Sequence, residues 1–206
     1  ANSGYNGGGY LSIPHSTTLN GNGSALTIEF WLWTPKWPGA SGDYLVYKSA
    51  VYATYINSTG KIALLLWGGL PANTVYSTGT VPVAQWAHIA VVYNGSNATF
   101  YINGVASGSS AINSWTPGGV QNVLVSYDAI SVGVATMMDE VRVSDVVRYT
   151  ANFTPPRRLP DEANAQFMLH FDGMSGVTAA DSSGNGNTGT LTGTVNNHIQ
   201  ITQGSH

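Results

Sequence analysis

The chain has 206 residues, which is long enough for one large all-β domain with a sizeable buried core. Only 8% of them are charged, with 7 Lys and Arg against 10 Asp and Glu and a net charge of −3. Basic residues are not clustered, so nucleic acid is not an expected partner. The absence of cysteine excludes disulfides, thiol nucleophiles and zinc–thiolate sites.

The composition favours a protein that works outside the cell. Few charges, 25 glycines and many Ser, Thr and Asn residues suit an extracellular, cell-surface or virion protein better than a cytosolic enzyme. A protein of this size has enough core to fold there without disulfides. No apolar run approaches the ~20 residues of a membrane span, so membrane insertion is not expected. The last residues, Gly204–His206, resemble the start of a purification tag.

From the N-terminus onward, short β-type runs alternate with turns rich in Gly, Asn, Pro and Ser. Val, Ile, Thr, Tyr and Trp are concentrated in these runs, which favours strands over helices. The expected strands are Tyr10–Ile13, Leu26–Thr34, Tyr44–Lys48, Tyr52–Ile56, Lys61–Trp67, Trp86–Tyr93, Ala98–Ile102, Val123–Ser126, Ile130–Val134, Met137–Val143, Gln166–Phe171, Gly189–Leu191 and His198–Thr202. Only Asp145–Tyr149 is a candidate for a helical turn.

Asn-Gly pairs mark tight turns, because both residues tolerate the positive φ that such turns need. Asn94 and Gly95 separate two of the expected strands as a hairpin, and Asn103 and Gly104 end the second of them. So many short strands with such turns predict an all-β sandwich of two antiparallel sheets with little helix.

Several segments, in their order and spacing, resemble the concanavalin-A-like, laminin-G-like jelly roll of bacterial surface and phage proteins. They are Tyr10–Pro14, Leu26–Trp31, Ser58–Lys61, Trp86–Gly95, Phe100–Gly104, Met138–Val143 and Arg148–Pro155. The resemblance covers about residues 5–172 and implies a two-sheet antiparallel jelly-roll sandwich.

The C-terminal part departs from this pattern. His170–Gly173 followed by Asp181–Asn187 resembles the opening of such a domain, although it lies near the end of the chain. Residues 173–203 therefore either complete the same sandwich or open a next repeat. We favour completion, because a lone strand with Phe167, Leu169 and Phe171 would expose apolar surface. Residues 1–203 then form one domain.

Asp139 is the first candidate metal ligand. Asp139 and Glu140 are adjacent in an expected strand, so they face opposite sides of the sheet and cannot form a catalytic pair. In the resembled family the matching aspartate often joins backbone carbonyls to hold a structural Ca²⁺. The alternative is that Asp139 pairs with the backbone, Arg142 or Arg148.

Asp181 and Asn185 are the other candidate calcium ligands. They offer carboxylate and amide oxygens on a glycine-rich loop, which suits Ca²⁺. The spaced acidic ligands of an EF-hand are missing. An ordinary Asx-rich turn has the same composition, and we favour it over a metal site here.

The tryptophans divide into two groups. Trp31 and Trp86 lie inside alternating strands, so we expect them in the core, and His88 beside Trp86 is expected to be a core or sheet residue. Trp37, Trp67 and Trp115 lie at loops or strand ends near Pro and Gly, where aromatic faces could stack on sugar rings. The alternative is that they close the ends of the sandwich. Tyrosines that could extend such a surface are Tyr47, Tyr52, Tyr55 and Tyr127.

An enzymatic function is not expected. Glycoside hydrolases on this scaffold need two carboxylates a short distance apart on one face. Neither Glu-x-Asp nor Asp-x-Glu spacing occurs, the laminarinase-type signature is absent, and no Gly-x-Ser-x-Gly elbow is present.

Two functions remain open. One is a non-catalytic carbohydrate-binding or adhesion module whose partner is a glycan or cell-surface polysaccharide. The other is a structural virion component, such as a tail-fibre or capsid-decoration domain, whose partners are proteins. Aromatic loops suit either function.

Overall fold

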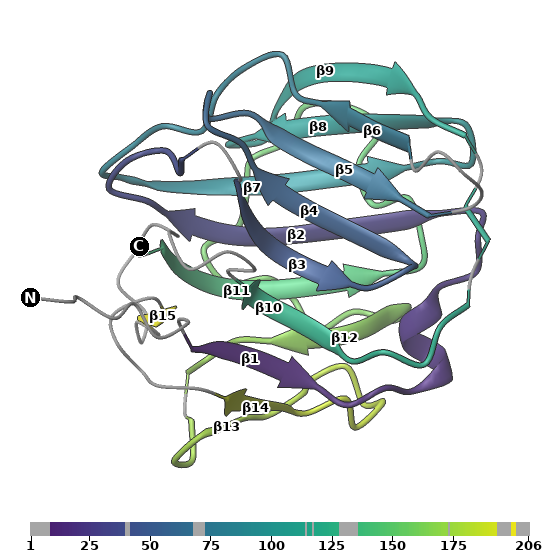
Figure 1. Ribbon diagram of the computed structural model, residues 1–206, viewed down its shortest axis with the longest axis vertical. Coiled ribbons are helices and arrows are strands. Elements are labelled where there is room, and N and C mark those ends of the chain that lie inside the picture. Colours follow the sequence, from purple (N-terminus) through teal and green to yellow (C-terminus); the bar gives the residue numbers. More distant parts are fainter. Residues whose placement is uncertain are drawn as a thin grey trace, which may run out of the picture.

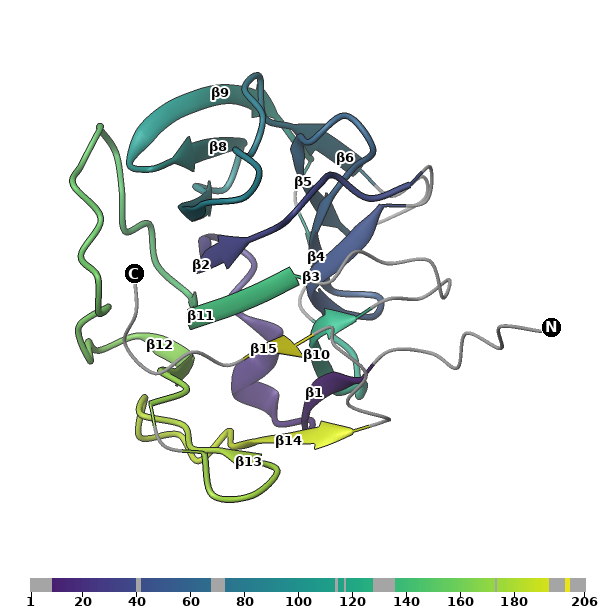
Figure 2. The same ribbon diagram turned by 90° about the vertical axis from the view of Figure 1, so that its left-hand side faces the viewer.

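The computed structural model describes residues 9–39, 42–67, 73–113, 115–116, 118–127, 136–172, 174–192 and 199–200. Within these residues the chain forms two stacked β-sheets (Figure 1). The view turned by 90° shows the sheets as two layers (Figure 2). A single 3₁₀ turn, η1 (Thr17–Asn20), is the only helix among the described residues. No helix in these ranges is long and apolar enough to cross a membrane.

The first sheet has 8 strands, and adjacent strands in it are antiparallel. In spatial order they are β13 (Thr178–Ala179), β14 (Gly189–Thr192), β1 (Tyr10–Ile13), β10 (Val123–Tyr127), β3 (Asp43–Lys48), β4 (Tyr52–Ile56), β5 (Ile62–Leu66) and β6 (Asn73–Tyr76).

The second sheet has 7 strands. Its antiparallel path is β12 (Ala165–Leu169), β11 (Thr136–Ser144), β2 (Leu26–Trp33), β7 (Trp86–Tyr93), β8 (Asn97–Ile102) and β9 (Val105–Ala111), and β15 (Ile199–Gln200) pairs in parallel with β11.

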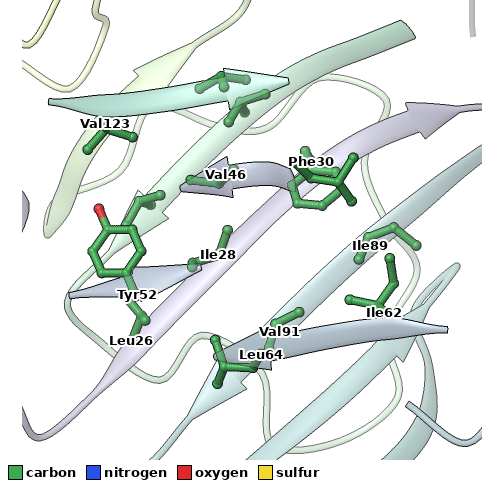
Figure 3. Packing of buried hydrophobic residues seen from close by; sticks show 14 of the residues in the cluster. Leu26, Ile28, Phe30, Val46, Tyr52, Ile62, Leu64, Ile89, Val91 and Val123 are labelled. Carbon is green, nitrogen blue, oxygen red and sulfur yellow. The ribbon is translucent and has the colours of Figure 1, made fainter. Parts of the chain in front are cut away.

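The core lies between the two sheets and follows from strand alternation. Leu26, Ile28 and Phe30 of β2 alternate along the strand and are fully buried. They lie in one cluster with Val46 and Leu64 of the first sheet (Figure 3). The outward residues of each sheet are left for other contacts.

The connection between β11 and β12 covers the outer face of the second sheet (Figure 2). Glu29 of β2 is fully buried beneath this connection. Its Oε1 accepts from Nε of Arg142 over 2.9 Å and lies 2.8 Å from Nη2 of the same residue. Tyr149 from the connection donates its hydroxyl to Glu29 Oε2 over 2.6 Å. His88 is also buried, with its ring 5.7 Å from that of Phe153. The outer face of this sheet is therefore largely occupied by the protein itself.

The predicted all-β sandwich is confirmed, and most of the expected strands are present. Three strands were missed, namely β6, β9 and β13. The strand expected over Ile130–Val134 lies outside the described residues, as does the Gly204–His206 tail. From the C-terminal part, β12 joins the second sheet, and β13 and β14 extend the first sheet beside β1.

Candidate functional site

Aromatic side chains cross the outer face of the first sheet. Six are only partly buried, and Tyr76 is 41% exposed. This aromatic strip consists of Tyr10 on β1, Tyr127 on β10, Tyr44 and Tyr47 on β3, Tyr55 on β4, Tyr76 on β6 and Trp67 directly after β5.

The rings of the strip form a continuous series of contacts. Tyr127 lies 5.4 Å from Tyr10 and 5.7 Å from Tyr47, with the second pair nearly parallel at 14°. Tyr47 is the centre of the series, because its ring is also 4.8 Å from Tyr44 and 6.1 Å from Trp67. Such separations are those of favourable aromatic pairs.

The other half of the strip runs from β3 to β6. The ring of Tyr44 is 5.6 Å from that of Tyr55, and Tyr55 is 6.1 Å from Tyr76. Ala63 on β5 lies between the last two in the strand pairing. Because its side chain is small, the hydroxyls of Tyr55 and Tyr76 approach to 2.8 Å across it.

Two strand irregularities keep these tyrosines on one face. Tyr44 and Tyr47 are three residues apart, so regular alternation would place them on opposite faces. The pairing of β3 with β4 shifts register between Tyr44 and Val46. On β10, Ser126 has a positive φ of 55°, and Tyr127 still pairs with Tyr44. Bulges of this kind redirect side chains.

The hydroxyls of Tyr44 and Tyr55 stay uncharged at neutral pH. Burial, together with Tyr47 and Tyr127, raises the pKa of Tyr44. Burial and the hydrogen bond with Tyr76 raise the pKa of Tyr55. The strip therefore offers apolar ring surface together with neutral hydrogen-bonding groups.

Only some of the predicted ligand-binding residues lie together in the structure. Trp67 and Tyr127 lie in the aromatic strip, together with Tyr47 and Tyr55. Trp37 lies apart: its Nε1 donates to the carbonyl of Val81 over 2.9 Å, and its ring covers Gly60 so closely that a Cβ there would be 2.2 Å away. Trp37 is 39% exposed.

Trp115 and Tyr52 were expected at a ligand-binding surface, but both side chains are buried. Trp115 is only 3% exposed and its ring contacts those of Tyr52 and Tyr93 at 6.1 Å each. Tyr52 is fully buried in β4, because Tyr52 and Ile56 alternate toward the core while Tyr55 points outward. Trp115 therefore fits the alternative prediction for the loop tryptophans, which is that they close the ends of the sandwich.

The prediction that Trp31 and Trp86 lie in the core is also wrong. Trp31 and Trp86 are half-buried and point away from the interior, since their neighbours Leu32 and Ala87 fill the core. Trp31 donates its Nε1 to the carbonyl of Pro156 in the covering connection over 3.2 Å. His88 is a buried sheet residue as expected.

The Asp181 loop is an Asx-rich turn and not a fit for calcium. Asp181 Oδ1 accepts from the backbone N–H groups of Met168 and Ser183, each over 2.9 Å. Its Oδ2 accepts from Ser183 Oγ and from the Asn187 N–H, each over 2.8 Å. Asn185 donates Nδ2 to the carbonyl of Ala165 over 2.7 Å. The carboxylate is saturated by protein donors, so it has no lone pair left for a cation.

Asp139 lies elsewhere, on β11, and is 1% exposed. Its Oδ1 accepts from the Glu140 N–H over 2.9 Å. No group of three or more His, Asp or Glu side chains suited to a metal occurs in the described ranges. A calcium ion at Asp139 would therefore depend on backbone carbonyls.

Sequence reasoning missed Tyr10, Tyr44 and Tyr76 as members of the strip. Tyr10 could have been predicted to face outward, because it alternates along β1 with the buried Leu11. The bulge that turns Tyr44 outward has no such signal, because it is a feature of how β3 pairs with β4 and not of the residue pattern along β3.

The comparison with known proteins identifies the family. A family described as the concanavalin A-like lectin/glucanases superfamily matches residues 5–152. The chain belongs to this superfamily. No curated protein matches it.

Two solved structures share the fold of this concanavalin A-like chain. One is a candidate carbohydrate binding protein from Bacteroides ovatus, with 17% identity, a TM-score of 0.65, and coverage of 94% of this chain and 60% of that one. Another is the binding domain of botulinum neurotoxin serotype C1, with 12% identity, a TM-score of 0.53, and coverage of 68% and 38%. This chain thus spans well under two thirds of the length of either structure.

Proposed function

We propose that the chain is a non-catalytic carbohydrate-binding module that holds a neutral glycan across the aromatic strip. The observation that carries this proposal is the continuous series of rings from Tyr10 to Tyr76 on the outer face of the first sheet. Sugar rings have apolar faces and hydroxyl edges, and the strip offers a partner for each.

The size of the strip suits an extended ligand. It crosses the strands from β1 to β6, which are adjacent in the sheet order β1-β10-β3-β4-β5-β6. At about 4.8 Å between neighbouring strands, five steps span about 24 Å. Several linked sugar units could therefore contact the strip at once.

The aromatic composition favours binding at low entropic cost. Tyr and Trp supply large contact areas with few rotatable bonds, so little freedom is lost when a ligand is bound. The hydroxyls of Tyr44 and Tyr55 remain donors because their raised pKa values keep them protonated. Charge has no part in this recognition, so we expect neutral polysaccharides to be preferred over acidic ones.

The relatives support a binding function at the level of fold. The Bacteroides ovatus structure is named as a candidate carbohydrate binding protein, and the neurotoxin fragment is named as a binding domain. We extend the binding function to this chain and place it outside the cell, where its low charge and lack of cysteine are no disadvantage.

The absence of catalysis is part of the proposal. The buried acids of the second sheet have protein partners: Glu29 binds Arg142 and Tyr149, and Glu140 accepts from the Leu159 N–H over 2.7 Å. Carboxylates held in this way are suited to stabilising the fold and not to protonating a glycosidic oxygen.

A glycan array tests the proposed function. The wild-type chain should bind neutral polysaccharides, and Tyr47→Ala should lose that signal while keeping its circular-dichroism spectrum. A wild-type chain that binds no glycan, or a Tyr47→Ala variant with the full pattern, would contradict the proposal.

A further inference from the structure

A second concave site lies away from the aromatic strip, where η1 contacts β12. This η1 pocket has a volume of about 390 Å³ and is lined by residues of η1, the turn after β11, the start of β12 and the Asp181 loop. The lining includes Thr17, Gly21, Asp145, Gln166 and Asn185. Its volume is within the range of about 300–1,000 Å³ for small-molecule sites.

The lining of the pocket is polar and almost neutral. Asp145 is the one ionisable residue among the lining residues, which otherwise carry hydroxyl, amide or backbone groups. No aromatic ring lines the pocket. A ligand here would therefore be recognised by hydrogen bonds and not by stacking.

Polar atoms at the pocket wall lack protein partners. Gln166 is 4% exposed, and both Oε1 and Nε2 of its side chain are buried without a hydrogen bond. Oδ1 of Asp145 is in the same state. Native proteins pair nearly all such groups, so a cluster of unpaired ones beside a pocket points to a partner that the polypeptide does not supply.

Gly21 leaves space beside the Gln166 amide. A Cβ at Gly21 would lie 3.3 Å from Gln166 Nε2 and 2.6 Å from the Trp115 ring. Gly21 also has a positive φ of 72°. A side chain at position 21 would therefore fill the space between the pocket and this buried amide, and glycine keeps that space open.

The rest of the wall is held rigidly. Asn187 donates Nδ2 to Thr18 Oγ1 over 3.0 Å and to the Gln166 carbonyl over 2.7 Å, which ties the Asp181 loop to η1 and β12. Asn185 uses Nδ2 for protein carbonyls, which leaves its Oδ1 as an acceptor. A preformed set of donors and acceptors costs little ordering when a ligand binds.

We propose that the η1 pocket binds a single neutral sugar unit through hydrogen bonds to Gln166, Asp145 and Asn185. A monosaccharide offers several hydroxyls, each both donor and acceptor, in a volume that the pocket can hold. The pocket shares no residue with the aromatic strip, so the two sites bind independently. The strip holds an extended chain by stacking, and the pocket holds one unit or chain end by hydrogen bonding.

Saturation-transfer NMR with the methyl glycosides of glucose, galactose, mannose and N-acetylglucosamine tests this proposal. At least one glycoside should receive saturation from the wild-type chain. Thr17→Trp, at an exposed residue of the pocket mouth, should abolish the signal by blocking entry, and Thr150→Trp, at an exposed residue outside the lining, is the matched control. Tyr47→Ala should keep the signal.

Gln166→Leu gives a second, independent readout. It removes the amide but keeps the backbone carbonyl that Asn185 and Asn187 use. The glycoside signal should fall at least tenfold, while the melting temperature should hold or rise because two unpaired polar atoms are removed. A falling melting temperature with unchanged binding would mean that the amide has a structural function, and would overturn its assignment as a ligand group.

The remaining outcomes separate this site from its alternatives. If Tyr47→Ala lost the saturation signal and Thr17→Trp kept it, the glycoside would bind at the strip. That result would overturn the pocket as a sugar site but not the strip. Calcium binding by calorimetry that Asp145→Asn abolishes, with no glycoside signal, would make the pocket a metal site. No saturation from any of the four glycosides would also overturn the proposal, without affecting polysaccharide binding by the strip.

Discussion

His170 is placed between two carboxylates. Its Nδ1 is 2.8 Å from Glu140 Oε2, and its Nε2 is 2.7 Å from Asp161 Oδ1. Burial disfavours the charged ring, but the hydrogen bonds to Glu140 and Asp161 outweigh it and raise the pKa of His170. The imidazolium thus ties the end of β12 to the connection that covers the second sheet.

This arrangement predicts a pH-dependent contribution to stability. A folded-state pKa above the unfolded value of about 6.5 means that the contribution is complete below about pH 6.5 and is lost as the pH rises through the folded pKa. The difference in unfolding free energy between wild type and His170→Gln, from urea titrations, should therefore be largest near about pH 5.5 and shrink toward about pH 9. A difference that is constant or grows with pH would contradict it.

At the scale of residues, burial could be predicted from the sequence only where alternation is regular. It failed for Trp115 and Tyr52, which were expected at the surface and are buried. It also failed for Trp31 and Trp86, because Trp31 lies between the core residues Phe30 and Leu32, and Trp86 precedes the core residue Ala87, so alternation turns both tryptophans away from the core. As Trp86 is half-buried, Trp86→Ala should cost less than the about 3–5 kcal/mol of a fully buried tryptophan.

At the scale of elements, the connection between β11 and β12 is fastened to the second sheet by buried charge. Burial disfavours the charged carboxylate of Glu29, but the His88 ring 3.5 Å away, the charge of Arg142 and the hydrogen bond from Tyr149 outweigh it and lower the pKa of Glu29. Arg142 is itself 2% exposed. Such an ion pair is destabilising when one partner is removed, because the other charge stays buried.

Glu29→Gln should therefore lower the unfolding free energy by about 3–5 kcal/mol. The substitution keeps the size of the side chain but removes the buried counter-charge of Arg142, whose other acidic neighbour, Glu162, is half-exposed and 3.8 Å away. Asp172→Asn is the matched control, since this half-exposed acid pairs with the half-exposed Arg158 and should cost less than about 1 kcal/mol. Equal losses of unfolding free energy for the two variants in chemical denaturation would show that the buried pair contributes no more to stability than the exposed pair.

The strands themselves were largely predictable, and their exceptions have physical causes. β9 has the sequence Val-Ala-Ser-Gly-Ser-Ser-Ala, which lacks the β-branched and aromatic pattern of a central strand, and it is stable because it pairs with β8 at the edge of the sheet. The aromatic strip was found only in part, because neither the bulge beside Tyr44 in the pairing of β3 with β4 nor the positive φ of Ser126 can be inferred from the residue pattern.

At the scale of the whole molecule, a calcium ion at Asp139 would stabilise the entire fold. We keep this site as a proposal, with Asp139 as the one acidic ligand and backbone carbonyls as the others. The melting temperature should then rise with calcium relative to chelator, since a ligand bound only by the folded chain shifts the equilibrium toward it. Asp139→Asn should abolish the difference. Identical wild-type melts in calcium and chelator, with no metal by elemental analysis, would exclude the ion.

The two sheets differ in what their outer faces can do. The second sheet is covered by the β11–β12 connection (Figure 2). The outer face of the first sheet carries the aromatic strip. This difference makes Tyr47 and Trp33 a useful pair. Both are half-buried aromatic residues that point outward, but from opposite layers of the sandwich.

Titration calorimetry of a neutral polysaccharide from the array against wild type, Tyr47→Ala and Trp33→Ala tests the strip most directly. Loss of a central stacking ring should weaken binding at least tenfold, or about 1.4 kcal/mol, in Tyr47→Ala. Trp33→Ala should bind as the wild type does. Unchanged affinity in a folded Tyr47→Ala variant, or a loss confined to Trp33→Ala, would contradict the strip as the glycan-binding surface.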